Sequence, residues 1–179
     1  SYLDSASAEQ IAAELERLRK LAPGEVLAAG SYQPETQTVQ YTVATHESIG
    51  AGIFHRLAGA LAAKGLSVLT AEINTLGDGW VLDCFRVEDG DFAGEPPQER
   101  LDEVARALAQ SLQQGGAPKL QQARRYGRGN QRPQPSQMPV QVRIDNATSD
   151  RATIVDVFAA DRTGLLYTIG RTLYELDLY

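Results

Sequence analysis

One pattern of apolar residues occurs twice in this chain, and the repetition restricts the possible folds more than any other feature. In each copy, alternating apolar residues lead through a glycine-bearing corner into apolar residues at helical spacing. A repeat at this separation predicts two copies of one domain. The matched positions are Gly52, Ile53, Phe54, Leu57, Leu61 and Leu66 in the first copy and Gly164, Leu165, Leu166, Ile169, Leu173 and Leu178 in the second.

The first copy continues into further elements. Residues 38–45 alternate as a strand, and a helix with its apolar stripe at Ile53, Leu57 and Leu61 ends at Gly65. The runs LSVLTAEINT and GWVLDCFRVED predict two strands joined by a hairpin turn at 76–79.

A second helix is predicted over 98–112, and PVQVRIDN at 139–146 alternates as a fourth strand. The resulting β-α-β-β-α-β order is the ferredoxin-like arrangement of an α+β protein. We therefore expect an antiparallel sheet with two helices on one face.

The second copy, within 148–179, holds only the first strand and the first helix. Its helix would leave an apolar stripe uncovered, so we expect the complete domain of the same chain or a second copy of the molecule to bury it. The stripe consists of Leu165, Leu166, Ile169, Leu173 and Leu176.

Three regions follow from this organisation. Residues 1–36 form an N-terminal helix, with a capping box at Ser7 and Gln10, and a connector. Residues 37–147 form the first domain, in which the stretch 113–138 carries five basic residues and no acidic one. Its glycine, proline and glutamine content predicts a mobile loop that serves as a spacer. Residues 148–179 begin a second domain.

Composition narrows the class of protein. Hydrophobic residues make up 42% of the chain, which is ordinary for a globular protein with a packed core. No apolar run reaches the roughly 18 residues of a membrane helix, and the N-terminus does not have the pattern of a signal peptide. Cys84 is the only cysteine, which excludes an intrachain disulfide and favours a cytoplasmic location. The missing initiator Met suggests a piece of a longer protein.

The corner of the second copy, Asp161–Arg162–Thr163–Gly164, has a chemical use. A turn that enters a helix presents unpaired backbone N–H groups and the positive end of the helix dipole, which favour a small anion such as a carboxylate. Asp161 could cap the helix, or it could neutralise the ammonium group of a ligand. The spacing alone leaves both roles open.

The residues also carry a family resemblance. TIVDVFAADRTGLLYTIGRTL, preceded by VRIDNATSDRA, resembles the second ACT domain of the bacterial uridylyltransferases that modify the nitrogen-regulatory PII protein. The run GIFHRLAGALAAKGLSVLTAEINTLGDGWVLDCFRVED resembles the first. The resemblance implies a regulatory amino-acid sensor with glutamine as its ligand, bound between paired domains of a homo-oligomer. It also implies a fragment without catalytic residues, cofactor or metal, which controls a nucleotidyltransferase acting on PII.

By the same resemblance, the ligand would contact Asp161, Arg162, Thr163, Gly164 and Leu165. The first corner departs from the family, because it reads THESIGAGIF in place of an Asp-Arg-Pro-Gly turn. There Glu47 would take the acidic role, while Gly50 and Gly52 leave room for the backbone to approach a ligand next to Ile53.

Several side chains have more ordinary interpretations. His46 and His55 lack a third ligand and do not predict a metal site, and Cys84 is expected in the core. Trp80 could line a pocket but is expected in the core or in an interface. Asp83 could be a site carboxylate, but we expect it to face solvent at one end of the sheet.

Two other functions compete with the amino-acid sensor. The degenerate first corner is compatible with a ligand-free module whose sheets or helices dimerise. RNA-recognition modules share the same element order, and the basic stretch could follow phosphates. Against RNA binding stand the acidic body and the spacing of Trp80 and Phe85, which predicts opposite faces of one strand.

Overall fold

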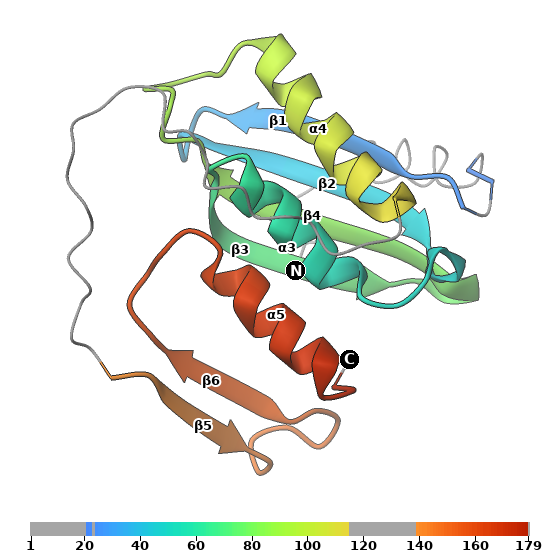
Figure 1. Ribbon diagram of the computed structural model, residues 1–179, viewed down its shortest axis with the longest axis vertical. Coiled ribbons are helices and arrows are strands. Elements are labelled where there is room, and N and C mark those ends of the chain that lie inside the picture. The colour runs from blue at the N-terminus through green and yellow to red at the C-terminus, as the bar shows by residue number, and fades with distance from the viewer. Residues whose placement is uncertain (1–20, 23, 115–138, 179) are drawn as a thin grey trace. The chain divides into compact units, whose positions relative to one another are not determined.

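A computed structural model describes residues 21–22, 24–114 and 139–178 of the chain (Figure 1). The helix predicted near the N-terminus and nearly all of the basic stretch at 113–138 lie outside the described residues. The described residues divide into two compact units, of which one holds residues 21–22, 24–114 and 163–178 and the other holds residues 139–162.

The first unit contains a four-stranded antiparallel sheet with the strand order β1-β2-β4-β3. Two helices, α3 and α4, lie on one face of this sheet, as predicted (Figure 1). The elements are β1 (Leu27–Gln33), β2 (Thr38–His46), the 3-10 turn η1 (Glu47–Ile49), α3 (Ile53–Ala63), β3 (Ser67–Thr75), the 3-10 turn η2 (Gly77–Gly79), β4 (Trp80–Glu88) and α4 (Gln98–Gln113).

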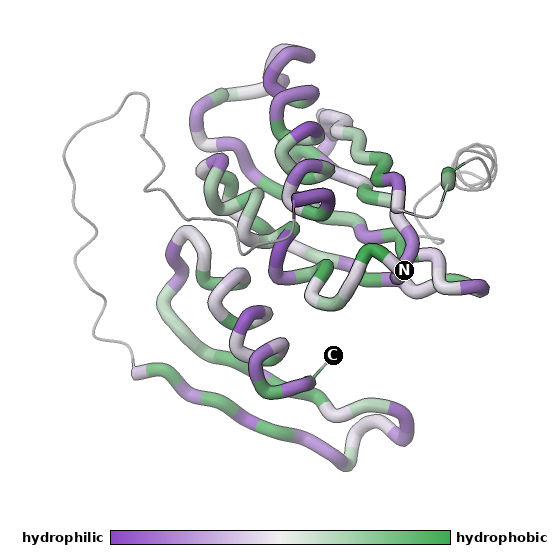
Figure 2. The backbone as a smooth tube through the Cα atoms, turned by 45° about the vertical axis from the view of Figure 1, so that its right-hand side comes forward, coloured by the Kyte–Doolittle hydropathy of each residue, from purple (hydrophilic) through white to green (hydrophobic). Residues whose placement is uncertain are grey.

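The core lies between the sheet and the two helices. Tyr41 and Phe85 from the central strands are at most 1% exposed, and they pack with Leu57 of α3 and Leu108 of α4. Burial raises the pKa of the Tyr41 hydroxyl to about 12. Along its turns α4 alternates hydrophilic and hydrophobic residues, as expected for a helix with one face on a sheet (Figure 2).

Two arginines tie the helix ends to the rest of this unit. Arg56 of α3 is buried, and its guanidinium donates to the carbonyl oxygens of Ser111, Leu112 and Gln114 at 3.0, 2.7 and 3.2 Å. It thereby satisfies carbonyl groups at the C-terminus of α4, which have no partner within the helix. Arg100 pairs with the buried carboxylate of Asp89 at 2.8 Å and donates to the Lys64 carbonyl oxygen after α3.

Two strand assignments made from the sequence were wrong. Residues 27–33 were placed in a connector, but they form β1, an edge strand paired with β2. The strand at 139–146 was predicted as the fourth strand of this sheet. It forms β5 (Gln141–Asp145), which pairs with β6 (Ile154–Phe158) in a separate two-stranded sheet of the other unit.

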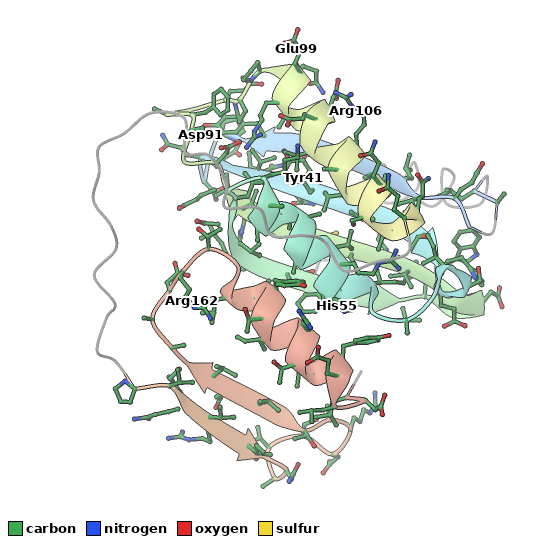
Figure 3. The ribbon with its side chains drawn as sticks, viewed as in Figure 1. Tyr41, His55, Asp91, Glu99, Arg106 and Arg162 are labelled. Atoms are coloured by element: carbon green, nitrogen blue, oxygen red, sulfur yellow. The ribbon has the colours of Figure 1, made fainter. Side chains whose placement is uncertain are left out.

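Helix α5 (Leu165–Glu175) belongs to the first unit and packs on α3. Its contact face carries Tyr167 and Gly170, both buried, together with Tyr174. The ring of His55 points from α3 toward α5 and lies 4.6 Å from the ring of Tyr174 (Figure 3).

The helix of the second copy is therefore covered by the complete domain of its own chain, but through a different stripe from the one predicted. Small and aromatic side chains make the contact. Four of the five predicted leucine and isoleucine side chains are half-buried, whereas Leu176 is 63% exposed, contrary to the prediction.

The two copies begin and end their helices in the same way. Gly52 precedes α3 with φ 78°, and Gly164 precedes α5 with φ 82°, the left-handed conformation that favours glycine. After the helices, Leu66 donates to the Leu61 carbonyl oxygen and Leu178 to the Leu173 carbonyl oxygen. The repeat detected in the sequence thus corresponds to a repeat of local structure.

None of the helices in the described residues combines the length and the apolar character that a membrane crossing requires.

The α3–α5 contact predicts the effect of enlarging Gly170. A Cβ atom there would lie 2.9 Å from the Phe54 ring, so this ring, stacked near Phe85, would have to shift. Although alanine favours a helix over glycine by roughly 1 kcal/mol, overpacking typically costs about 1–3 kcal/mol. We expect Gly170→Ala to reduce amide hydrogen-exchange protection in α5, relative to the exposed control Thr172→Ala. Protection equal to that of the control would contradict this packing.

Candidate functional site

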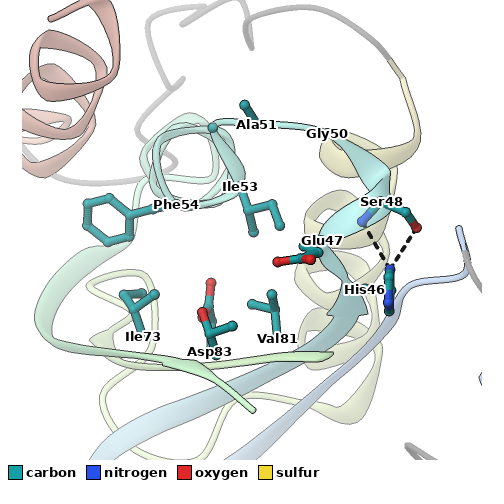
Figure 4. Close-up of a pocket in the computed structure, with 12 residues that line it drawn as sticks. His46, Glu47, Ser48, Gly50, Ala51, Ile53, Phe54, Ile73, Val81 and Asp83 are labelled. Atoms are coloured by element: carbon teal, nitrogen blue, oxygen red, sulfur yellow. Dashed lines mark hydrogen bonds between the residues drawn. The ribbon is translucent and has the colours of Figure 1, made fainter. Parts of the chain in front are cut away.

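A pocket of about 560 Å³ opens beside the N-terminus of α3 (Figure 4). Its floor comes from the central and edge strands of the sheet, and its rim comes from the corner that joins β2 to α3. All of these elements belong to the first unit. The lining residues are His46, Glu47, Ser48, Gly50, Ala51, Gly52, Ile53, Phe54, Ile73, Thr75, Val81 and Asp83.

The rim is shaped by the glycine-rich corner. Because the N-cap position of α3 is Gly52, no N-cap side chain accepts hydrogen bonds from the N–H groups of the first helical turn. Those N–H groups and the helix dipole favour an anionic group at this end of the helix. Gly50, with φ 112°, turns the chain immediately before.

Asp83 lies at the floor of the pocket and corrects the sequence prediction. It was expected to face solvent at one end of the sheet, but its side chain points into the pocket and is only 1% exposed (Figure 4). Neither carboxyl oxygen has a hydrogen-bond partner of good geometry among the described residues. Burial raises the pKa of this carboxyl to about 7, against a smaller opposing effect of the Asn74 backbone N–H.

Two other ionisable groups line the pocket. Glu47 is exposed, and its carboxylate lies so close to Gly79 that a Cβ atom there would stand 2.8 Å from one oxygen. His46 accepts from the Ser48 N–H through Nδ1 at 3.0 Å, which leaves Nε2 to donate to the Asp78 carbonyl oxygen at 2.9 Å. Both ring nitrogens of His46 are thereby engaged.

The structure brings together four of the residues assigned to a ligand site from the sequence. Glu47, Gly50, Gly52 and Ile53 all line this pocket. The sequence analysis missed Phe54, Ile73 and Val81, whose side chains form its apolar walls. The sequence did contain evidence for Val81, because Val81 and Asp83 are two residues apart on one strand and therefore share a face.

The five residues assigned at the second corner do not line this pocket. Asp161, Arg162 and Thr163 are exposed, whereas Gly164 and Leu165 are half-buried at the start of α5. Their role in binding stays a prediction.

The structure also bears on the other candidate chemistries. Across residues 21–22, 24–114 and 139–178, no three His, Cys, Asp or Glu side chains are grouped closely enough to hold a metal ion. His55 is buried against α5, and burial lowers the pKa of its imidazole.

Trp80 packs edge-on against His46 beside Leu82, whereas Phe85 lies in the core on the other face of β4. The two aromatic rings therefore do not form the shared stacking surface that an RNA-recognition sheet displays.

No protein-family model matches the chain. It is 33% identical over 130 residues to the bifunctional uridylyltransferase/uridylyl-removing enzyme of Gluconobacter oxydans, an alignment covering 71% of this chain and 14% of that protein. The enzyme of the same name from Azospirillum brasilense is 36% identical over 130 residues, with the same two shares. The one from Caulobacter vibrioides is 29% identical over 180 residues, 99% of this chain and 19% of that protein.

These similarities confirm the resemblance to bacterial uridylyltransferases that was stated from the sequence. The resemblance concerns only a small part of those proteins, because the chain spans between 14% and 19% of the length of these relatives. Similarity over most of this chain and a small part of a larger enzyme is what a regulatory fragment would show.

Asp83 predicts an unusual dependence of stability on pH. The folded protein holds a proton on Asp83 up to pH about 7, whereas an unfolded chain releases it near the ordinary value of 3.8. The free energy of unfolding should therefore fall by roughly 2–4 kcal/mol as the pH rises from about 4 to 7. We expect Asp83→Asn to remove this loss, so that the variant is more stable than the wild type at pH 8. Urea denaturation between pH 4 and 8 measures it.

The matched control is Glu47→Gln, which removes an exposed carboxylate from the same pocket and should leave the pH dependence in place. A wild-type stability that stays flat or rises over this range would contradict the buried, unpartnered state of Asp83.

Proposed function

We propose that this chain is an amino-acid-sensing regulatory region of ACT type, which controls a uridylyltransferase acting on the nitrogen-regulatory PII protein. The observation that carries the proposal is the pocket at the N-terminus of α3, in a chain similar to one segment of uridylyltransferases. Glutamine is the proposed ligand, and it comes from the family resemblance. Such a chain would be cytoplasmic and would leave catalysis to other parts of the parent enzyme.

The fold supports the assignment to the ACT type. The order β1-β2-β4-β3, with α3 and α4 on one face, matches a ferredoxin-like sheet if β1 occupies the edge position of its last strand. The β5–β6 hairpin and α5 then repeat β1, β2 and α3. We therefore assign β5 to the second, incomplete ACT-like domain and not to the first.

The pocket offers two features that suit a small zwitterion. The uncapped N-terminus of α3 favours a carboxylate, while Glu47 and Asp83 supply negative charge for an ammonium group. The apolar walls from Ile53, Ile73 and Val81 would contact the carbon chain of an amino acid.

Regulation would act through the contact between the two copies. A Cβ atom on Gly52, which lines the pocket, would stand 3.2 Å from the Tyr174 ring of α5. A ligand that favours one position of the corner would therefore favour one position of α5. Binding would shift the population between two arrangements of the domains, and so between two states of the parent enzyme.

A second candidate function is a ligand-free dimerisation module. It is favoured by β3, an edge strand whose apolar side chains Leu69 and Ile73 are each 48% exposed. An exposed edge with apolar residues can pair with a second copy. A homo-oligomer is proposed under either function.

Isothermal titration calorimetry tests the sensor on a longer chain that carries both ACT-like domains complete. We expect saturable heat with glutamine at millimolar concentration or below, and a much weaker response to glutamate, which replaces the amide by a second carboxylate. Absence of heat with every amino acid would contradict the proposed amino-acid-sensing function. Light scattering after size exclusion would then favour the dimerisation module, if it shows a dimer that no amino acid alters.

A further inference from the structure

The carboxyl group of Asp83 has no structural explanation within the described residues. Buried polar side chains are nearly always hydrogen-bonded, because an unpaired one forfeits its hydration without compensation. Asp83 is 1% exposed, and within the part of the chain that the structure describes neither of its oxygens has a hydrogen-bond partner of good geometry. Its side chain points into the pocket and not into the packed core (Figure 4). The group is therefore placed for a partner that comes from outside the chain.

The pocket itself supplies no positive charge to Asp83. No lysine or arginine is among its lining residues. The neighbours from β3 and α3 are Ile73, Thr75, Ile53 and Phe54, none of which titrates, and the Glu47 carboxylate from η1 adds negative charge. The ligand must bring the compensating charge.

His46, from the end of β2, does not pair with Asp83 either. Both of its ring nitrogens are already engaged, with the Ser48 N–H and with the Asp78 carbonyl oxygen.

We propose that Asp83 binds the primary ammonium group of the ligand, while the uncapped N–H groups at the start of α3 bind its carboxylate. Asp83 thereby selects α-amino acids over otherwise identical acids that lack the ammonium group. This inference rests on the proposed amino-acid-sensing function and names the residue that determines its specificity. Asp83 contributes the buried half of the recognition, where an ion pair is least screened by water.

Binding should then be linked to a proton. The ammonium group pairs with the ionised carboxylate, and burial keeps much of Asp83 protonated in the empty pocket below pH about 7. The ligand displaces that proton, so affinity should fall as the pH falls, by about tenfold between pH 8 and pH 6. The heat at pH 6 should depend on the ionisation enthalpy of the buffer, because nearly one proton is released.

The test uses the 179-residue chain, since the pocket lies within it. Glutamine and 4-carbamoylbutanoate, the same molecule without its ammonium group, are titrated into the wild type, into Asp83→Asn and into the control Glu72→Gln, which removes an exposed carboxylate of β3 that does not line the pocket. We expect Asp83→Asn to weaken glutamine binding on the order of 10- to 100-fold, and Glu72→Gln to leave it within about threefold of the wild type. A thermal melt verifies that each variant is folded.

The unaltered protein provides an arm that does not depend on any variant. The wild type should bind glutamine and not 4-carbamoylbutanoate. Equal binding of the two molecules, or of glutamine by wild type and Asp83→Asn, would overturn the role of Asp83 and leave the sensor intact. A wild type that binds no amino acid at pH 8 would overturn the role of Asp83 in this pocket, whereas calorimetry on the longer chain decides the sensor itself.

Discussion

Helix α3 is buried on several sides at once, and the position of the pocket depends on that burial. Eight of its residues, His55 through Ala62, are buried. Leu57 and Leu61 face the sheet, Arg56 reaches the end of α4, and His55 faces α5. A helix held from three directions has little freedom to move, so its first turn is fixed over β4. The position of α3 therefore sets the distance between its first turn and the pocket residues of β3 and β4.

The same constraint explains the small residues along α3 and α5. Where two helices pack closely, a residue without a side chain lets the ring of a neighbour take its place. Gly170 receives the Phe54 ring in this way, and Gly52 lies against Tyr174. The N-terminal corner of α3 is therefore in contact with the helix of the second copy. Ligand recognition and contact between the copies meet at one residue, and this supports regulation through the position of α5.

Much of this fold could be predicted from the sequence, because most of its elements have one clear period. The stripes of α3 and α4 and the alternation in β2 identify them. Asp78 and Gly79 adopt the positive φ expected of the hairpin turn. Periodicity does not name the partner of a strand, however. The run at 139–146 alternates equally well whether it joins the large sheet or pairs with β6, and only the tertiary structure decides.

Strand β1 was missed for a different reason. Its sequence LAAGSYQ lacks the β-branched residues and the clean alternation that mark a strand. Gly30 lies opposite Tyr41 of β2, and the Tyr41 ring occupies the space that a Cβ atom on Gly30 would need, so β1 packs through a side chain of β2. Evidence for this strand therefore lies in its hairpin partner β2 as much as in β1, and the periodicity of β1 alone does not reveal it.

The candidate site could be predicted at its rim but not at its floor. Glycines before a helix mark a corner wherever it lies in space, so Gly50 and Gly52 pointed to the rim. Asp83 is surrounded by apolar neighbours in a strand that is buried on both faces. In such a strand the usual inference, that a charged residue faces water, holds for Arg86 and Glu88 but fails for Asp83. A carboxyl group kept there without a partner costs folding free energy. A protein that used Asp83 only for structure would gain stability from almost any neutral residue of the same size. The cost is understandable if the group meets a partner when the pocket is filled, and the burial that makes Asp83 unfavourable in the empty pocket is what would make its ion pair strong in the occupied one.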